Sequence, residues 1–326
     1  MSDPRPYPAY ANISTFLQLP WVTTPEDLRE MRPDFAIVGA PFDMATTHRP
    51  GARFGPRAIR AASYLTQSSL HHLGLGISPF DYLKGVDYGD APCIPAEIER
   101  NHDIIRATLR ALYEAVPDVI PIVLGGDHSI TYPSASVVSE RYGGRLGVLH
   151  FDAHADAADE SFGVHLSHGT PMRRLIEGGF VAGRNFVQVG LRGYWPPPDV
   201  LGWMREHGMR SHTAYEIEER GFDRVLDLAI AEVLDGAEHL YLSIDIDVLD
   251  PAFAPGTGTP EPGGLSAREL LRAVRRVATT LPLVAMDVVE VSPPFDSAGI
   301  TAEVAHRTCL EAISGLAVKF RDGFSR

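Results

Sequence analysis

Cysteine is almost absent from this 326-residue chain, which contains only Cys93 and Cys309. Two thiols so far apart have no paired-cysteine zinc spacing and make a poor disulfide framework. The polar, proline-rich start MSDPRPYP has no apolar run of the kind found in a signal peptide. The longest apolar stretches, such as residues 119–124, are far too short to cross a bilayer. These absences favour a cytoplasmic protein in a reducing compartment, without a membrane partner.

Positive charge is also scarce, because 29 lysines and arginines stand against 42 aspartates and glutamates. The net charge of −13 disfavours binding to nucleic acid or to an anionic membrane, since both require a cationic surface. A small cationic ligand remains compatible with this charge. Apolar residues at 44% and charged residues at 22% are ordinary for a globular protein and exclude a disordered or fibrous chain.

Short β-type runs alternate with helical patterns along most of the chain. We expect strands at residues 35–40, 83–86, 120–124, 146–151, 186–189, 209–213, 239–246 and 283–289. We expect helices at residues 56–63, 97–115, 266–276 and 302–316, where Ser266 and Glu269 resemble a capping box. Several strands are apolar almost throughout, as in strands covered on both faces. The pattern predicts an α/β protein with three layers, α/β/α, around a mostly parallel sheet of about eight strands.

The length alone would allow two domains of ~150 residues each. No linker, repeat or low-complexity segment divides the chain, however, and the strand–helix alternation is continuous. We therefore predict an N-terminal arm over residues 1–33, followed by a single catalytic domain over residues 34–326.

Acidic and imidazole side chains follow three of the predicted strands. Residues two apart in an extended chain point to the same side, and the loops beyond the carboxyl ends of parallel strands carry the chemistry. A turn or a helix cap would explain any one of these aspartates, but not three such strand ends together. The candidates are His128 after the first of these strands, Asp152, His154 and Asp156 after the second, and Asp245 and Asp247 at the end of the third.

Such a cluster requires cations. Each pair of carboxylates ~4 Å apart would repel by about 4 kcal/mol at an effective dielectric constant near 20. Carboxylate and imidazole ligands suit two Mn²⁺ ions, with Ni²⁺, Co²⁺ or Zn²⁺ possible by ligand type. The sequence therefore predicts a binuclear metal site.

Five motifs resemble, in order, the signatures of the ureohydrolase family, which comprises arginases, agmatinases and related amidinohydrolases. They are RPGARFGP at residues 49–56, LGGDHS at 124–129, FDAHAD at 151–156, SIDIDVLDPAFAPGTGTP at 243–260 and MDVVEVSP at 286–293. The resemblance covers nearly the whole chain. It implies an arginase-like fold and hydrolysis of a guanidino group to urea and an amine.

The resemblance also implies a role for each matching position. Glu290 would clamp the substrate guanidinium in a charge-assisted contact, and His168 would transfer a proton to the leaving amine. His165 is a rival for that transfer, and His150 is expected to orient a metal ligand. Without the resemblance, Glu290 could be an ordinary carboxylate at a sheet end and His168 an ordinary loop histidine. One metal ion would be held by His128, Asp152, Asp156 and Asp245, and the other by Asp152, His154, Asp245 and Asp247, so that Asp152 and Asp245 bridge.

Further residues bear on which guanidino compound is hydrolysed. Arginases typically have an asparagine two residues after the last aspartate of FDAHAD, where this chain has Ala158, so arginine is disfavoured. Asp159 and Glu160 would attract the distal ammonium of agmatine. Arg173, Arg174 or Arg192 could instead receive a carboxylate. We predict hydrolysis of agmatine to putrescine, with 4-guanidinobutyrate or 3-guanidinopropionate as the alternative substrates.

Two further classes of function stay open at this point. The chain could be a non-catalytic subunit that binds metal ions for stability. It could also be a binuclear hydrolase of phosphoesters, although the net negative charge disfavours an anionic substrate. Because members of the ureohydrolase family form trimers or hexamers, we also expect a homotrimer or homohexamer.

Overall fold

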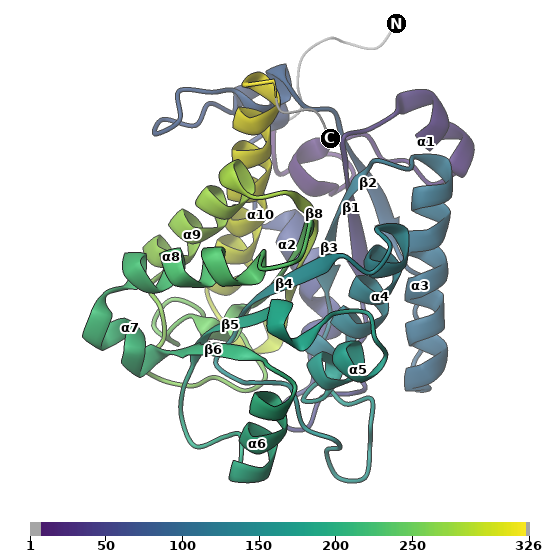
Figure 1. The fold of residues 1–326 in the computed structure, drawn as a ribbon. Helices are drawn as coiled ribbons and strands as arrows, with labels where there is room; N and C mark the ends of the chain where they lie inside the picture. The colour runs from purple at the N-terminus through teal and green to yellow at the C-terminus, as the bar shows by residue number, and fades with distance from the viewer. Residues whose placement is uncertain (1–7, 324–326) are drawn as a thin grey trace, which may run out of the picture.

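Eight parallel strands form one sheet in the computed structural model, which describes residues 8–323 (Figure 1). Residues 1–7, the first part of the predicted arm, and residues 324–326 lie outside the described residues. The strand order is β2-β1-β3-β8-β7-β4-β5-β6. This result confirms the predicted α/β/α class and sheet. The strands are β1 (Phe35–Ala40), β2 (Gly85–Asp90), β3 (Ile120–Gly125), β4 (Leu146–Phe151), β5 (Phe186–Leu191), β6 (Arg210–Thr213), β7 (His239–Asp245) and β8 (Leu283–Val289).

The strand β2 differs most from its prediction, because it begins at Gly85 and continues to Asp90 instead of ending at residue 86. Its second half is polar, and the Arg60 guanidinium explains why it remains in the sheet. Arg60 binds both Asp87 oxygens at 2.8 and 3.0 Å and the Asp90 carboxylate at 2.6 Å. An ion-pair network therefore replaces the apolar burial on which the prediction was based.

The four predicted helices are present, and the capping box between Ser266 and Glu269 is confirmed. Six further helices within residues 8–323 were missed. Among them, α4 has the sequence TYPSASVVSER, and eight of its residues are buried, so it lacks the one-sided apolar pattern of a surface helix. The helices are α1 (Pro25–Met31), α2 (Gly55–Ala61), α3 (Ile98–Ala115), α4 (Thr131–Arg141), α5 (Pro171–Glu177), α6 (Pro198–Glu206), α7 (Ala214–Arg220), α8 (Phe222–Val233), α9 (Ala267–Thr280) and α10 (Ile300–Arg321).

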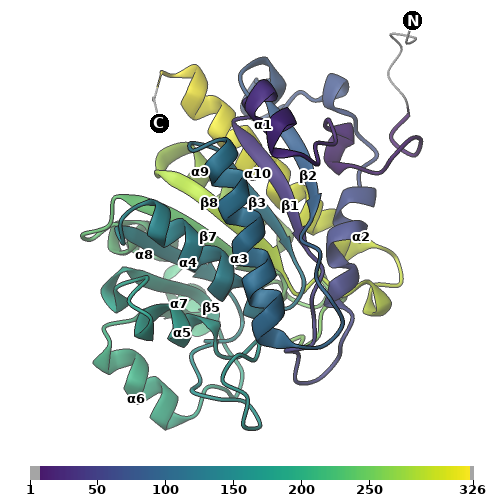
Figure 2. The same cartoon turned by 90° about the vertical axis from the view of Figure 1, so that its right-hand side faces the viewer.

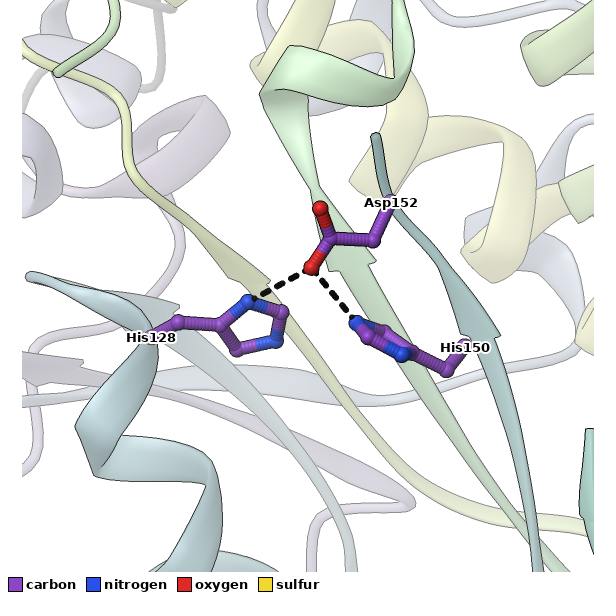
Figure 3. Close-up of side chains that lie close together, drawn as sticks. All are labelled: His128, His150 and Asp152. Atoms are coloured by element: carbon purple, nitrogen blue, oxygen red, sulfur yellow. Dashed lines mark hydrogen bonds and ion pairs between the residues drawn. The ribbon is translucent and has the colours of Figure 1, made fainter. Parts of the chain in front are cut away.

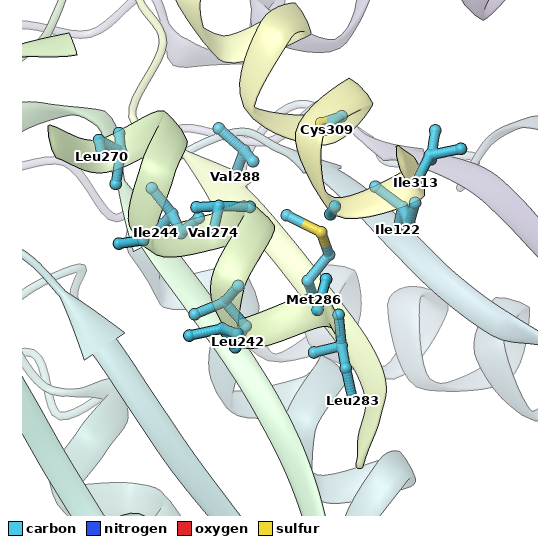
Figure 4. Close-up of a cluster of buried hydrophobic side chains, with 14 of the residues drawn as sticks. Ile122, Leu242, Ile244, Leu270, Val274, Leu283, Met286, Val288, Cys309 and Ile313 are labelled. Atoms are coloured by element: carbon cyan, nitrogen blue, oxygen red, sulfur yellow. The ribbon is translucent and has the colours of Figure 1, made fainter. Parts of the chain in front are cut away.

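Helices cover both faces of the sheet, with α9 and α10 on one side and α3 and α4 on the other (Figures 1 and 2). Successive strand residues therefore enter different cores. Ile122 belongs to the core beneath α2, α8, α9 and α10, part of which is drawn in Figure 4. Its neighbour Val123 belongs to the core beneath α1, α3, α4 and α5. Burial on both faces explains the almost continuous apolar runs of the central strands.

The segment before β1 packs against this domain where it is described. Phe16, Leu17 and Leu28 are buried, and the Phe16 ring stacks on His306 with centroids 4.2 Å apart. The backbone N–H of Phe16 donates to Asp87 at 2.9 Å. Among the helices of residues 8–323, none combines the length and the apolarity needed to cross a membrane.

Candidate metal centre and active site

Four neighbouring strands, β3, β8, β7 and β4, carry the candidate residues at their carboxyl ends. Parallel strands end at the same edge of the sheet, so residues more than a hundred positions apart meet there. The sequence alone could not provide this strand order. This strand order brings eight candidate side chains into one region, namely those of His128, Asp152, His154, Asp156, Asp245, Asp247, His168 and Glu290.

The first group surrounds the Nδ1 atom of His128. This nitrogen lies 3.1 Å from Asp152, 3.0 Å from Asp156 and 3.1 Å from Asp245, measured to Oδ2 in each case. All four side chains are buried. Burial opposes the imidazolium form, but the three close carboxylates hold the pKa of His128 well above its ordinary value. The group is the one expected for the first metal ion.

Asp156 reaches this group in an unexpected way. The expectation that Asp152, His154 and Asp156 share one side depended on an extended chain, whereas β4 ends at Phe151. Asp156 has a left-handed backbone with φ of 48°. A non-glycine residue in this region costs about 1–2 kcal/mol, so the surrounding structure must hold it there.

The second group contains Asp152, His154 and Asp247. The Nδ1 atom of His154 lies 3.0 Å from Asp247 and 3.5 Å from Asp152. Asp152 is thus common to both groups. Asp245 is grouped only with the first. Its Oδ1 accepts the backbone N–H of Asp247 at 2.8 Å. Its bridging role stays a prediction.

This donor set fits two divalent cations. Burial and the nearby Asp247 and Asp152 raise the pKa of Asp245 well above its ordinary value. Excess negative charge is therefore concentrated here. In addition, the buried Nδ1 atom of His128 has no hydrogen-bond partner of good geometry, although three carboxylates surround it. Carboxylate oxygens and imidazole nitrogens are ligands of Mn²⁺, Ni²⁺, Co²⁺ and Zn²⁺.

His150 lies beside the first group, as Figure 3 shows with His128 and Asp152. Its Nε2 is 2.8 Å from Asp152 Oδ2, while its Nδ1 faces the side-chain amide of Gln188 at 3.0 Å. The side-chain nitrogen of Gln188 can only donate, so His150 Nδ1 accepts from it. His150 therefore carries its proton on Nε2 and donates it to Asp152. His150 therefore orients a candidate ligand, as predicted. Gln188 was missed, although a polar residue within the apolar strand FVQVGL was a usable signal.

Glu290 and His168 form a second part of the site. Glu290 follows β8 with a left-handed backbone, φ 62°, and is buried. Its Oε1 accepts from the backbone N–H of His128 and from His168 Nδ1, each at 2.9 Å. Its Oε2 is buried and has no hydrogen-bond partner among the described residues. Two hydrogen bonds thus hold Oε1 in place, whereas Oε2 can still accept a hydrogen bond from a bound ligand.

Thr47 completes this arrangement and was missed from the sequence. Its backbone N–H donates to His168 Nε2 at 3.1 Å, and its hydroxyl lies 2.7 Å from the same nitrogen. Burial opposes the charged form, but the Glu290 carboxylate and its hydrogen bond raise the pKa of His168 to about 9. His168 is therefore placed to hold a proton. His165 is exposed and contacts the backbone of Asp159, so the structure does not bring it to Glu290.

The loop that carries Thr47 is held by the end of β3. Asp127 accepts from the backbone of Ala45 at 2.9 Å and from Ser129 at 3.1 Å, so it caps the following turn and also anchors the loop. A Cβ atom on Gly126 would collide with the backbone of Phe42, so only glycine permits this approach. Burial and the charge of Glu290 raise the pKa of Asp127 to about 7.

A cavity of about 520 Å³ opens above these groups. Its outer wall contains Asp159, Glu160 and Asp199 together with Phe162 and Trp195. The described residues that line it include neither lysine nor arginine.

The three candidate arginines all have other partners. Arg174 binds Asp159 at 2.8 Å, and Arg173 binds Glu177 at 2.7 Å. Arg192 is buried among backbone carbonyl groups, including that of Asp247 at 2.7 Å. Asp159 and Glu160, expected to attract an ammonium group, do line the cavity, but Asp159 is paired with Arg174.

Comparisons with known proteins agree with this geometry. A family model described as the arginase family matches residues 33–315. The chain is 42% identical to proclavaminate amidinohydrolase from Streptomyces clavuligerus, over 93% of each chain. It is 41% identical to guanidinopropionase from Pseudomonas aeruginosa, over 97% of this chain and 95% of the relative. A solved structure of a hypothetical agmatinase from Burkholderia thailandensis superposes with a TM-score of 0.85 at 34% identity, covering 97% and 93% of the two chains.

Proposed function

Because this chain belongs to the arginase family, we propose that it is a binuclear-metal amidinohydrolase that cleaves a small guanidino compound into urea and an amine. One observation carries the proposal. Two candidate ligand groups share Asp152, and the free oxygen of Glu290 lies in the same buried region. A non-catalytic protein that only bound metal ions would not require that unpaired buried oxygen or the Glu290–His168–Thr47 chain.

We propose that His128, Asp152, Asp156 and Asp245 hold one ion, and that Asp152, His154, Asp245 and Asp247 hold the other. Mn²⁺ is the first choice, and Ni²⁺ or Co²⁺ is possible by ligand type. When bound, such ions lower the pKa of water from about 15.7 to near 7 and so supply a nucleophile at neutral pH.

Glu290 binds the substrate guanidinium through Oε2. Burial opposes ionisation, but the nearby His168, its hydrogen bond and the backbone N–H of His128 lower the pKa of Glu290, which stays charged. Because Oε1 is fixed by two donors, Oε2 has a defined direction. The carboxylate therefore orients the guanidinium carbon as well as attracting its charge.

His168 supplies the proton for the leaving amine. Its Nδ1–H is held by Glu290, and in the structure Nε2 accepts the backbone N–H of Thr47 at 3.1 Å. The transferable proton is therefore the one that Nε2 carries only in the imidazolium form, where it faces the Thr47 hydroxyl at 2.7 Å. Thr47 lines the cavity, and its hydroxyl can accept from Nε2 and donate onward. The proton thus passes from His168 through Thr47 to the amine.

Agmatine is the substrate that the cavity favours. The distal ammonium would meet Glu160 and Asp199, which are exposed acidic residues of the wall. Arg173, Arg174 and Arg192, the arginines considered for a carboxylate, already have partners. A guanidino acid such as 3-guanidinopropionate is the second candidate, since guanidinopropionase is a relative at 41% identity.

Urea release from agmatine, 4-guanidinobutyrate and 3-guanidinopropionate tests the proposal, with Mn²⁺ and with Ni²⁺. We expect the highest kcat/KM for agmatine. Asp199→Asn and Glu160→Gln should raise KM for agmatine and leave or lower KM for the acids. Glu219→Gln, which removes one exposed charge outside the cavity lining, is the control. Absence of urea with every substrate and both metals would overturn the proposal and favour a non-catalytic subunit.

The assembly is a separate proposal. We propose a homotrimer or homohexamer that acts on a small molecule in the cytoplasm, without a nucleic-acid or membrane partner. Analytical ultracentrifugation measures the subunit number directly, and a monomer at micromolar concentration would contradict it.

A further inference from the structure

A buried chain of hydrogen bonds connects His128 to a carboxylate that lies outside both candidate ligand groups. The Nε2 atom of His128 is 3.0 Å from Ser243 Oγ. Ser243 Oγ in turn donates to Asp287 Oδ1 at 2.8 Å. Ser243 lies on β7 and Asp287 on β8, and their side chains are fully buried between the helix layers.

The Asp287 carboxylate accepts hydrogen bonds from three hydroxyl groups. Besides Ser243, the hydroxyl groups of Thr131 and Tyr241 each donate to its Oδ2 at 2.7 Å. Three donors from α4 and β7 therefore hold the carboxylate in place. These contacts tie α4 and β7 to β8, and the bond from Ser243 extends the chain to His128.

The direction of the protons follows from the chemistry of the groups. A serine hydroxyl has one proton, and Ser243 gives it to Asp287. Ser243 can then only accept from His128, so His128 carries a proton on Nε2. In the neutral imidazole the lone pair is consequently on Nδ1, the atom that faces Asp152, Asp156 and Asp245.

We propose that Asp287 is a positioning residue for the metal centre, which acts through Ser243 to fix His128 in the tautomer whose Nδ1 is open to a cation. The inference rests on the metal site of the proposed function, but not on the substrate. It concerns one ion of the pair, because His128 belongs to the first ligand group and the second contains His154 instead.

Stepwise Mn²⁺ binding to the metal-free full-length protein tests this inference by calorimetry, with electron paramagnetic resonance to count free ions. In Ser243→Ala the Nε2–H of His128 loses its acceptor. We expect the affinity of one ion to fall by about 10- to 100-fold, the range found when partners of ligating histidines are removed. The affinity of the other ion should change less than about 3-fold. Asp287→Asn keeps a side-chain oxygen that can accept from Ser243, so it should weaken the same ion less than Ser243→Ala does.

Tyr241→Phe is the matched control, because it removes one donor to Asp287 but leaves the Ser243–His128 link intact. It should bind both ions with wild-type affinity. Equal weakening of both ions in Ser243→Ala, or the same loss in Tyr241→Phe, would overturn the inference. If the wild type binds no Mn²⁺, the metal site of the proposed function itself fails.

A second measurement needs no substitution. Imidazole ¹⁵N spectra of the wild-type protein loaded with diamagnetic Zn²⁺ report which nitrogen of His128 carries the proton. Protonation of Nε2 supports the inference, and an unprotonated Nε2 overturns it even if the variants do not fold.

Discussion

The substitution Glu290→Gln tests whether Glu290 binds the substrate guanidinium without contributing to metal binding. The glutamine carbonyl can still accept the two hydrogen bonds made to Oε1, from the backbone of His128 and from His168. At the position of Oε2, however, the variant places an amide donor opposite the donors of the guanidinium. A hydrogen bond to a charged group contributes about 1.5–3 kcal/mol. The electrostatic attraction of two charges ~4 Å apart adds up to about 4 kcal/mol at an effective dielectric constant near 20.

Because part of that attraction is offset by desolvation, we expect a net loss of about 1.5–4 kcal/mol. This corresponds to a fall of roughly 10- to 1000-fold in kcat/KM at 1.4 kcal/mol per decade. Steady-state urea release measures it, and calorimetry with Mn²⁺ should give unchanged affinities for both ions. Loss of a metal ion would place Glu290 among the ligands, and unchanged kcat/KM would refute its contact with the guanidinium.

The same variant should change the pH profile. His168 must be protonated to serve the leaving amine, so activity is present below its pKa and is lost as the pH rises through it. In the wild type this alkaline limb is expected near pH 9, since the Glu290 charge helps raise the pKa of His168 to about 9. Removing that charge should move the limb to lower pH, and an unmoved limb would assign it to another group.

Three other predictions concern separate parts of the molecule. Asp152→Asn should weaken the binding of both ions by roughly 1000-fold, because this residue belongs to both ligand groups and loses a full charge. Calorimetry that finds the affinity of either ion unchanged would contradict this prediction. Thr47→Val should lower kcat by about 10-fold or more with KM little changed, whereas Thr47→Ser should retain activity, and equal rates in both would exclude the hydroxyl from the proton path. His306→Asn should reduce the acid sensitivity of folding. Burial lowers the pKa of His306 to about 4, so its contribution to stability is present above pH 6.5 and is lost as the pH falls toward 4, by up to about 3 kcal/mol. Urea unfolding at several pH values measures that slope, and an unchanged slope would show that His306 does not titrate on unfolding.

The sequence predicted those parts of the fold that depend on local pattern. The apolar strand runs and the capping box of α9 are properties of neighbouring residues, and the structure has them. The missed α4 is helical because both of its sides are buried by elements distant in sequence, which no local periodicity reports. The continuation of β2 likewise depends on Arg60, which is 27 positions from Asp87.

The residues of the candidate site likewise fall into those that the local sequence pattern indicated and those that it did not. Candidate ligands were recognisable because each follows an apolar strand, and the structure brings them together. Their division into two groups came from the family resemblance and not from the local pattern, since Asp156 reaches its group through a left-handed backbone that the strand pattern does not indicate. Gln188, Ser243 and Asp287 are polar residues inside apolar strands, so a search for such interruptions would have found them. Thr47 offered no signal of that kind, because it lies in a polar loop.

The spread of the ligand donors along the chain links cation supply to folding. The donors lie between residues 128 and 247, so the unfolded polypeptide cannot gather them around an ion. An ion that binds only the native state adds about 2.7 kcal/mol to the free energy of unfolding when its concentration is 100 times its dissociation constant. Removal of the bound divalent cation should therefore lower the free energy of unfolding as well as the activity, and so expose more of the chain to proteolysis.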